Sequence, residues 1–300
     1  MSAPRQALLL PERRRFAGQP LARPVARALG RADRLPDGEA GERAQLQRWF
    51  ELLPRGWPMA AITRQRDAGD AELHSWLRAD PAYVRPDMTG ARVLAVGELG
   101  LSADEAKALS DALRPLFGDA GFPISAPHPA RWYLALPVEA RLPAFAGPEA
   151  VLGDDLFLHL PEGPEGRRWR ALLNEAQIIL HNHPVNEARI ASGRVPANSL
   201  CFWGAGRLPD QVKARLRTVR SDEAQLASLA ALAATSPAAD GELLDLRDAR
   251  EWSAVEAIVM EALDRREASG FVLDFADGAV FVLRPGQRWR LLRPALAKLA

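Results

Sequence analysis

Residues 181–207 hold the densest group of side chains in this chain that could do chemistry. The stretch opens with HNHPVN and ends in a Gly-Ala-Gly turn followed by arginine. Arginine and asparagine near strand and helix ends suit an anionic small ligand, because they offer several N–H donors. This hypothesis assigns seven ligand-binding residues: His181, His183, Asn186, Arg189, Asn198, Trp203 and Arg207. The alternative is structural, with asparagines that satisfy loop backbone groups and arginines that face solvent.

The two histidines of HNHPVN do not predict a metal site. In a helix, residues i and i+2 point about 200° apart, so His181 and His183 cannot share an ion from one helix face. A zinc site also needs a third and a fourth ligand. The remaining histidines stand in no H-x-x-x-H or H-x-E arrangement: His74, His128 and His159. We therefore expect no bound metal and place His181 at a helix end that Pro184 enforces.

Other familiar catalytic patterns are missing from the sequence. There is no G-x-S-x-G motif and no Walker-type lysine motif. Cys201 lies in an apolar run, which is typical of a packed, unreactive thiol. The turn formed by Gly204, Ala205 and Gly206 could offer backbone N–H groups to an anion beside Arg207, or it could be only a turn. No cofactor is predicted.

The elements that must position these residues alternate between strands and helices. Apolar runs predict strands at 6–11, 59–63, 91–96, 131–137, 198–206 and 242–248. Helical spacing predicts helices at 23–35, 42–53, 72–81, 101–121, 167–183, 222–234 and 250–267. Ser102 and Glu105 form a capping box, and Asp277-Gly278 predicts a hairpin over 271–285, with a third strand at 288–294. The prediction is an α/β fold: a mixed, mostly parallel sheet flanked by helices, with a C-terminal antiparallel hairpin.

Composition limits the partners that this chain can have. Hydrophobic residues make up 48% and charged residues 26%, and the net charge is +1. Such a balance provides no general field for nucleic acid or for an anionic membrane, so neither is predicted as a partner. A single cysteine fits a reducing compartment, and no long apolar segment is present, so we expect a cytoplasmic protein. We predict one α/β domain over 1–300, with a candidate subdivision near 138–150.

The block RWRALLNEAQIILHNHPVNEARIASGRVPANSLCFWGAGRLP, residues 168–209, resembles the RpfE-type bacterial regulatory proteins, an uncharacterised family. LRADPAYVRPD at 77–87, LSADEAKAL at 101–109 and PARWYLALP at 129–137 agree more loosely. Where that family has an aromatic residue before Phe202, this chain has Cys201. The resemblance implies a regulatory role, exerted through a small ligand or a protein partner.

The pattern H-P-x-N-x-x-R-x-x-G-x-x-P-A-N-x-x-x-x-W-G-x-G also resembles archaeal-type cofactor-independent phosphoglycerate mutases of the alkaline phosphatase superfamily. That resemblance implies an alkaline-phosphatase-like core in part, two divalent metals and a phosphorylatable serine or threonine. The superfamily has an Asp-Gly after its first strand and histidine ligands toward the C-terminus. This chain has Pro11-Glu12 there and no histidine after His183. We therefore expect a mutase-like protein without the catalytic metal centre, which binds a small anionic or phosphorylated ligand or a protein partner. The alternative is an active cofactor-independent phosphoglycerate mutase or phosphatase.

Overall fold

The chain folds as two compact units, which a computed structural model describes over residues 4–88, 90–235, 240–264 and 270–299. Unit 1 combines residues 1–55 with 210–300, and unit 2 is the continuous segment 56–209. The stretch 138–150 lies inside unit 2, between β7 (Arg131–Leu136) and the short helix α5 (Pro148–Val151). The unit boundaries fall instead beside Arg55 and Pro209.

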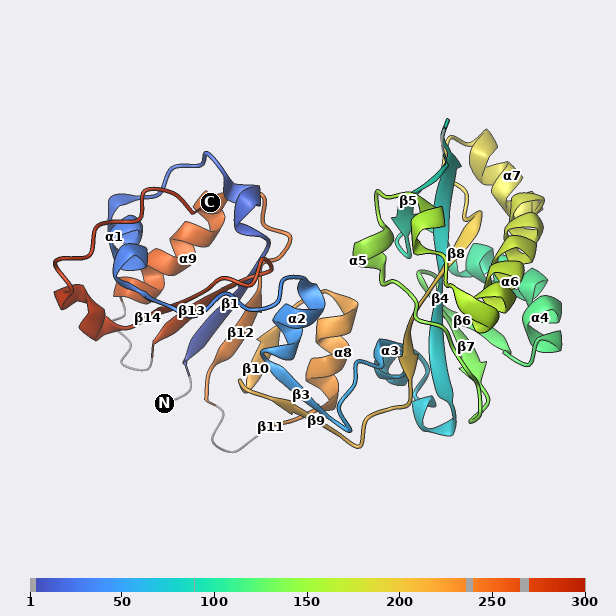
Figure 1. Ribbon diagram of the computed structural model, residues 1–300, viewed down its shortest axis with the longest axis horizontal. Helices are drawn as coiled ribbons and strands as arrows, with labels where there is room; N and C mark the ends of the chain where they lie inside the picture. The colour runs from blue at the N-terminus through green and yellow to red at the C-terminus, as the bar shows by residue number, and fades with distance from the viewer. Residues whose placement is uncertain (1–3, 89, 236–239, 265–269, 300) are drawn as a thin grey trace. The chain divides into compact units, whose positions relative to one another are not determined.

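Unit 1 contains a six-stranded sheet whose central strands are parallel (Figure 1). Its order is β10 (Thr218–Arg220), β12 (Glu242–Asp245), β1 (Gln6–Leu10), β13 (Phe271–Phe275), β14 (Val280–Leu283) and β2 (Asp33–Arg34). Strands β10 to β13 pair in parallel, whereas β14 pairs antiparallel with β13 and with β2. The predicted hairpin is confirmed. In β1 the four residues from Ala7 to Leu10 are fully buried, as expected for a strand covered on both faces.

Two long helices pack on this sheet, α1 (Arg23–Arg31) and α9 (Trp252–Asp264). A three-stranded sheet, β11 (Ala233–Thr235), β9 (Gln211–Ala214) and β3 (Phe50–Leu53), completes unit 1 with α2 (Glu42–Gln47) and α8 (Ala224–Leu232). The prediction of one helix over 42–53 is wrong, because the chain leaves α2 after Gln47 to pair with β9. The prediction of a strand at 288–294 is also wrong: this segment contains the end of the 3-10 helix η4 (Pro285–Trp289) and irregular chain.

Unit 2 is built around β4 (Ser75–Pro86), a long strand paired on both edges (Figure 1). β8 (Ser199–Gly206) pairs along one edge, and β7 and β5 (Ala91–Val96) pair with successive parts of the other. β6 (Ile124–His128) pairs with β7. All these pairs are antiparallel, so parallel pairing is confined to unit 1 among the described strands. The mixed α/β class is nevertheless confirmed.

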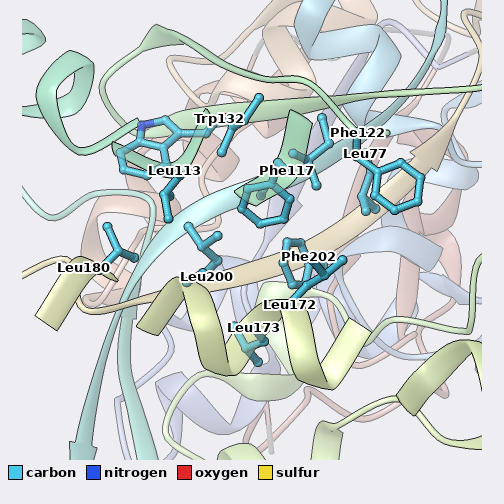
Figure 2. Packing of buried hydrophobic residues seen from close by; sticks show 14 of the residues in the cluster. Leu77, Leu113, Phe117, Phe122, Trp132, Leu172, Leu173, Leu180, Leu200 and Phe202 are labelled. Atoms are coloured by element: carbon cyan, nitrogen blue, oxygen red, sulfur yellow. The ribbon is translucent and has the colours of Figure 1, made fainter. Parts of the chain in front are cut away.

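Helices α4 (Ala103–Asp119) and α6 (Gly163–His181) cover this sheet and form a core with it. Figure 2 shows part of that core, to which different elements contribute Phe117, Trp132, Leu173 and Phe202. The Ser102–Glu105 capping box of α4 is present as predicted. No helix among the described residues combines the length and the apolar character that crossing a membrane requires.

Two predicted elements of unit 2 have the opposite type. The predicted strand at 59–63 is helix α3 (Met59–Ala68), whose first six residues are all buried, so that no amphipathic period marks it. The predicted helix at 72–81 is mostly β4, in which Arg78 and Asp80 are buried charges. Charged residues in a strand interior hide the apolar run that usually identifies a buried strand.

Candidate functional site

HNHPVN joins α6 to α7 (Pro184–Ala191). His181 is the last residue of α6 and its side chain is exposed, which matches its predicted place at a helix end. His183 caps α7: its Nδ1 accepts a hydrogen bond from the backbone N–H of Val185 at 3.2 Å. Because that nitrogen accepts a hydrogen bond, the ring has its own hydrogen on Nε2 when neutral. At this helix junction, His181 therefore ends α6, whereas His183 caps α7.

Asn186 is fully buried and fastens the start of α7 to the segment that leads into β8. Its Nδ2 donates to the carbonyl oxygens of Leu180 at 2.7 Å and Ala197 at 2.9 Å. Its Oδ1 accepts from the backbone N–H of Ala197 at 2.9 Å. The side-chain amide is thus engaged at both ends by backbone groups of the protein.

Arg189 is 1% exposed and connects α7 to the N-terminus of α4. Its guanidinium donates to the carbonyl oxygens of Leu99 at 2.6 Å and Val195 at 2.9 Å, and to the Glu105 carboxylate at 2.8 Å. Glu105 also closes the α4 capping box and forms an ion pair with Arg194. Burial raises the pKa of Glu105, but the Ser102 backbone N–H and the two arginines outweigh burial and lower it.

Asn198 lies just before β8 and Trp203 lies within it, and both side chains bind the neighbouring strand β4. Asn198 exchanges two hydrogen bonds with the backbone of Val84, at 2.8 and 2.9 Å, and so extends the ladder with a side chain. The indole N–H of Trp203 donates to the buried Asp80 carboxylate at 2.7 Å. Both side chains therefore stabilise the strand pair.

The Gly-Ala-Gly segment is the end of β8 and packs closely against the start of α3. A Cβ on Gly204 would lie 3.2 Å from the backbone nitrogen of Ala60, and one on Gly206 would lie 2.7 Å from Pro58 Cβ. Both glycines also have positive φ angles, 67° and 147°. Close packing against the start of α3 therefore accounts for the two glycines, and no bound anion is needed to explain them. Arg207, the next residue, is exposed.

The seven predicted residues thus fall into separate groups. Asn186 and Arg189 share the segment 195–197, and Asn198 and Trp203 face β4. His183 caps α7, and His181 and Arg207 are exposed. Their role in ligand binding stays a prediction.

Sequence reasoning missed a larger polar cluster between α3, β4 and β7, which we call the arginine–aspartate array. Three pairs form it: Arg64–Asp70, Arg78–Asp80 and Arg131–Asp67, with shortest distances of 2.6, 2.7 and 2.7 Å. Aromatic rings pack against two of the guanidiniums: Arg64 lies 4.3 Å from the Trp76 ring centre, and Arg78 lies 4.9 Å from that of Trp203. The close sequence spacing of R-x-D at 78–80 was the available signal. Every arginine of the array has its own carboxylate, so the array is charge-balanced.

Protonation in the array follows from burial and hydrogen bonding. Burial alone raises the pKa of Asp67, but hydrogen bonds from Arg131 and the Tyr133 hydroxyl outweigh it and lower the pKa. Burial raises the pKa of Tyr133 strongly, so the phenol keeps its proton and remains a donor. Burial likewise raises the pKa of Cys201, which keeps the thiol protonated and unreactive near neutral pH.

The carboxyl ends of the parallel strands in unit 1 form a second candidate region, because α/β sheets bind ligands at that edge. Asp245 ends β12 and holds Arg247 by two bonds of 2.7 and 2.8 Å. Asp274 in β13 holds Arg48 at 2.7 Å and accepts from the Trp49 indole at 2.7 Å. We call these two aspartates, together with Asp277 and the arginines that the three bind, the carboxyl edge.

The third carboxylate of the carboxyl edge, Asp277, lies just after β13 and holds Arg13 at 2.7 Å. Arg13 itself follows β1, beyond Pro11 and Glu12. Burial raises the pKa of Asp245, but Arg247 outweighs it and lowers that pKa. Burial raises the pKa of Asp274 despite its partners.

These residues do not fit the two divalent ions that the mutase resemblance implies. Such ions bind through ionised carboxylate oxygens and imidazole nitrogens that face them together. Here guanidinium groups occupy the carboxylate oxygens of Asp245, Asp274 and Asp277. Among the described residues, no group of three or more His, Cys, Asp or Glu side chains is arranged to hold a metal ion.

Comparison with known proteins identifies one local homology. No family model matches the chain. A 62-residue segment is 40% identical to a probable 2,3-bisphosphoglycerate-independent phosphoglycerate mutase of Geobacter sulfurreducens. Segments of the same length are 36% and 40% identical to the mutases of Methanosarcina mazei and Methanosarcina barkeri. Each match covers 21% of this chain and 16% of the relative, so the homology spans about a sixth of the length of these enzymes.

Two solved structures align with most of the chain at low similarity. A cofactor-independent phosphoglycerate mutase from Thermoplasma acidophilum covers 95% of this chain and 90% of its own, with 16% identity and a TM-score of 0.36. The PH0037 protein from Pyrococcus horikoshii covers 95% and 88%, with 11% identity and a TM-score of 0.46.

Proposed function

We propose that this chain is a phosphoglycerate-mutase-like regulatory protein that binds a small anionic or phosphorylated ligand and performs no metal-dependent phosphoryl transfer. The observation that carries the proposal is the carboxyl edge of unit 1. Its aspartates Asp245, Asp274 and Asp277 each bind an arginine of the same chain. The local homology to phosphoglycerate mutases supports descent from a phosphate-handling ancestor.

A guanidinium cannot replace a divalent ion in this chemistry. A metal ion lowers the pKa of bound water and coordinates the attacking and leaving oxygens directly. An arginine instead donates N–H bonds in a fixed plane and keeps its proton at all physiological pH values. A metal ion at the carboxyl edge would have to displace Arg247 from Asp245, which is 9% exposed at its side chain. Breaking such a buried pair is strongly unfavourable.

Among the seven predicted ligand-binding residues, the exposed ones are the candidates for contact with the ligand. Arg207 and His181 are solvent-accessible, whereas Asn186 and Arg189 are occupied by backbone groups. An RpfE-type regulatory protein would use such a ligand, or a protein partner, as its signal. The names of the local relatives make 3-phosphoglycerate the first probe.

The catalytic half of the proposal is tested by assaying the full chain with 3-phosphoglycerate and with a generic phosphomonoester, with Mn²⁺ or Zn²⁺ added. A cofactor-independent mutase serves as the positive control. We expect turnover no higher than in the protein-free blank, because the aspartates of the carboxyl edge are bound to arginines and do not hold the metals. Turnover that follows the purified protein and disappears in Asp245→Asn would establish the rival, an active mutase or phosphatase.

The binding half is tested by calorimetric titration of 3-phosphoglycerate into wild type and Arg207→Gln. Arg217→Gln is the matched control, since Arg217 is also exposed but lies in unit 1. Loss of one charge-assisted hydrogen bond should weaken binding about tenfold. Arg189→Ala is unsuitable as a reporter, because Arg189 is buried and holds α7 to α4. No measurable binding by wild type, or equal binding by both variants, would contradict this assignment.

A further inference from the structure

Unit 1 contains a cleft of about 330 Å³ that neither the resemblance nor the carboxyl edge explains. It lies between α1, the end of α9, the β13–β14 pair and the 3-10 helix η4. A volume of this size is at the lower end of the range for small-molecule sites in proteins. The cleft uses no residue of the 181–207 block, so a ligand bound in it is independent of any ligand at Arg207.

Four of the thirteen residues that line the cleft are arginines, and none is acidic: Arg27, Arg31, Arg284 and Arg288. Arg284 is neutralised by Asp33 at 2.7 Å. The other three have no carboxylate within ion-pair distance among the described residues. Within the described part of the chain, the cleft lining therefore carries an excess of positive charge, although the whole chain has a net charge of only +1.

Arg31 is positioned at the cleft by the backbone of its neighbour Arg288. Its Nη1 donates to the carbonyl oxygen of Arg288 at 2.9 Å, which fixes the guanidinium across the cleft. Its Nε is buried and has no hydrogen-bond partner in the described part of the chain. A buried donor without a partner costs about 1–3 kcal/mol.

The walls between the arginines are apolar. Ala28 of α1, Leu263 of α9, Phe271 of β13 and Leu283 of β14 face the cleft. An inorganic ion would leave these surfaces in contact with water. A purely apolar molecule would leave three arginines without an anion. The combination selects a ligand that has both an anionic head and an apolar body.

We propose that this cleft is a binding site for a small amphiphilic anion, a carboxylate or phosphate monoester joined to a short acyl chain or aromatic ring. The head group pairs with Arg27 and Arg288 at the exposed rim. The apolar body lies against Leu263, Phe271 and Leu283.

The test uses the full chain and four simple probes in calorimetric titrations. Octanoate supplies both features, 1-octanol supplies the chain alone, inorganic phosphate supplies the charge alone, and octylamine supplies the chain with opposite charge. We expect saturable octanoate binding at least tenfold tighter than that of each other probe. Octyl phosphate against octanoate then distinguishes a phosphate-preferring from a carboxylate-preferring head site. Equal binding of octanoate and octylamine, or no octanoate binding, would overturn the proposal.

Substitutions at the rim locate the site without disturbing the fold. Arg27 and Arg288 are exposed, so Arg27→Gln and Arg288→Gln should each weaken octanoate binding about two- to fivefold, with Arg217→Gln equal to wild type. The double variant Arg27→Glu, Arg288→Glu should prefer octylamine to octanoate. A reversed preference cannot arise from unfolding. Octanoate binding unchanged in all the rim variants would place the ligand elsewhere and refute the assignment.

Discussion

Single polar residues in unit 2 hold together segments that are separate in the sequence. Asn186 is the clearest case, because three hydrogen bonds from one amide connect the end of α6 to the segment before β8. Residue type alone left two interpretations open for this block, ligand contact or backbone support. Which interpretation holds depends on whether residues 195–197 pack against the start of α7. The path of such a loop leaves no periodic signal in the sequence. The helix stop at Pro184 was predictable because proline acts locally.

We predict that Asn186→Ala lowers the free energy of unfolding by about 3 kcal/mol, because it leaves buried backbone groups of Leu180 and Ala197 without partners. Urea denaturation measures the change. Asn182→Ala is the matched control: Asn182 lies four residues earlier, is exposed and bonds only to Ile178 through its side chain, so its loss should cost below about 1 kcal/mol. Equal effects of the two substitutions would show that burial of the amide does not determine its contribution.

At the scale of elements, the arginine–aspartate array fastens helix α3 to the sheet of unit 2. Asp67 of α3 accepts from both Arg131 and Tyr133 of β7, at distances of 2.6 to 2.7 Å. The types of α3 and β4 were predicted wrongly for the same reason. Their sequences are dominated by burial and by ion pairs across elements, whereas sequence patterns report the period of an exposed face. Helices α4 and α6 each have such a face and were predictable.

The Asp67 contacts predict a specific pH dependence. The pKa of Asp67 is lowered in the folded protein, so its stabilisation is present above its unfolded value near 3.8 and is lost as pH falls further. Asp67→Asn should therefore cost about 2 kcal/mol at pH 7, and the difference from wild type should shrink between about pH 4 and pH 2. Urea titrations at several pH values measure this. Asp119→Asn, an exposed change in the same unit, should show no such trend. A constant difference across the range would contradict an ionised Asp67.

At the scale of the whole molecule, unit 2 is an insertion within unit 1. On the unit 1 side, Leu53 of β3 is paired with Gln211 of β9, so the two ends of the interruption are neighbours in one antiparallel pair. On the unit 2 side, Pro58 and Gly206 also lie close to each other. Both connections are only a few residues long, which leaves no extended linker for composition to reveal. Sequence composition therefore pointed to the looser stretch at 138–150, which lies within unit 2.

This arrangement predicts that the two units fold separately. Residues 56–209 have their own core around Trp132, Trp169 and Phe202, and the ends of the segment meet, so cutting both connections removes no contact within that core. The fragment should unfold in urea in one cooperative transition. In the complementary chain, an Asn-Gly turn replacing 54–210 should join Leu53 to Gln211 and close the β3–β9 pair as a hairpin, because that dipeptide favours a two-residue turn. Circular dichroism and denaturation of each fragment provide the measurement. A fragment 56–209 without cooperative unfolding would show that unit 2 depends on unit 1 for its stability, since every contact within its own core is retained.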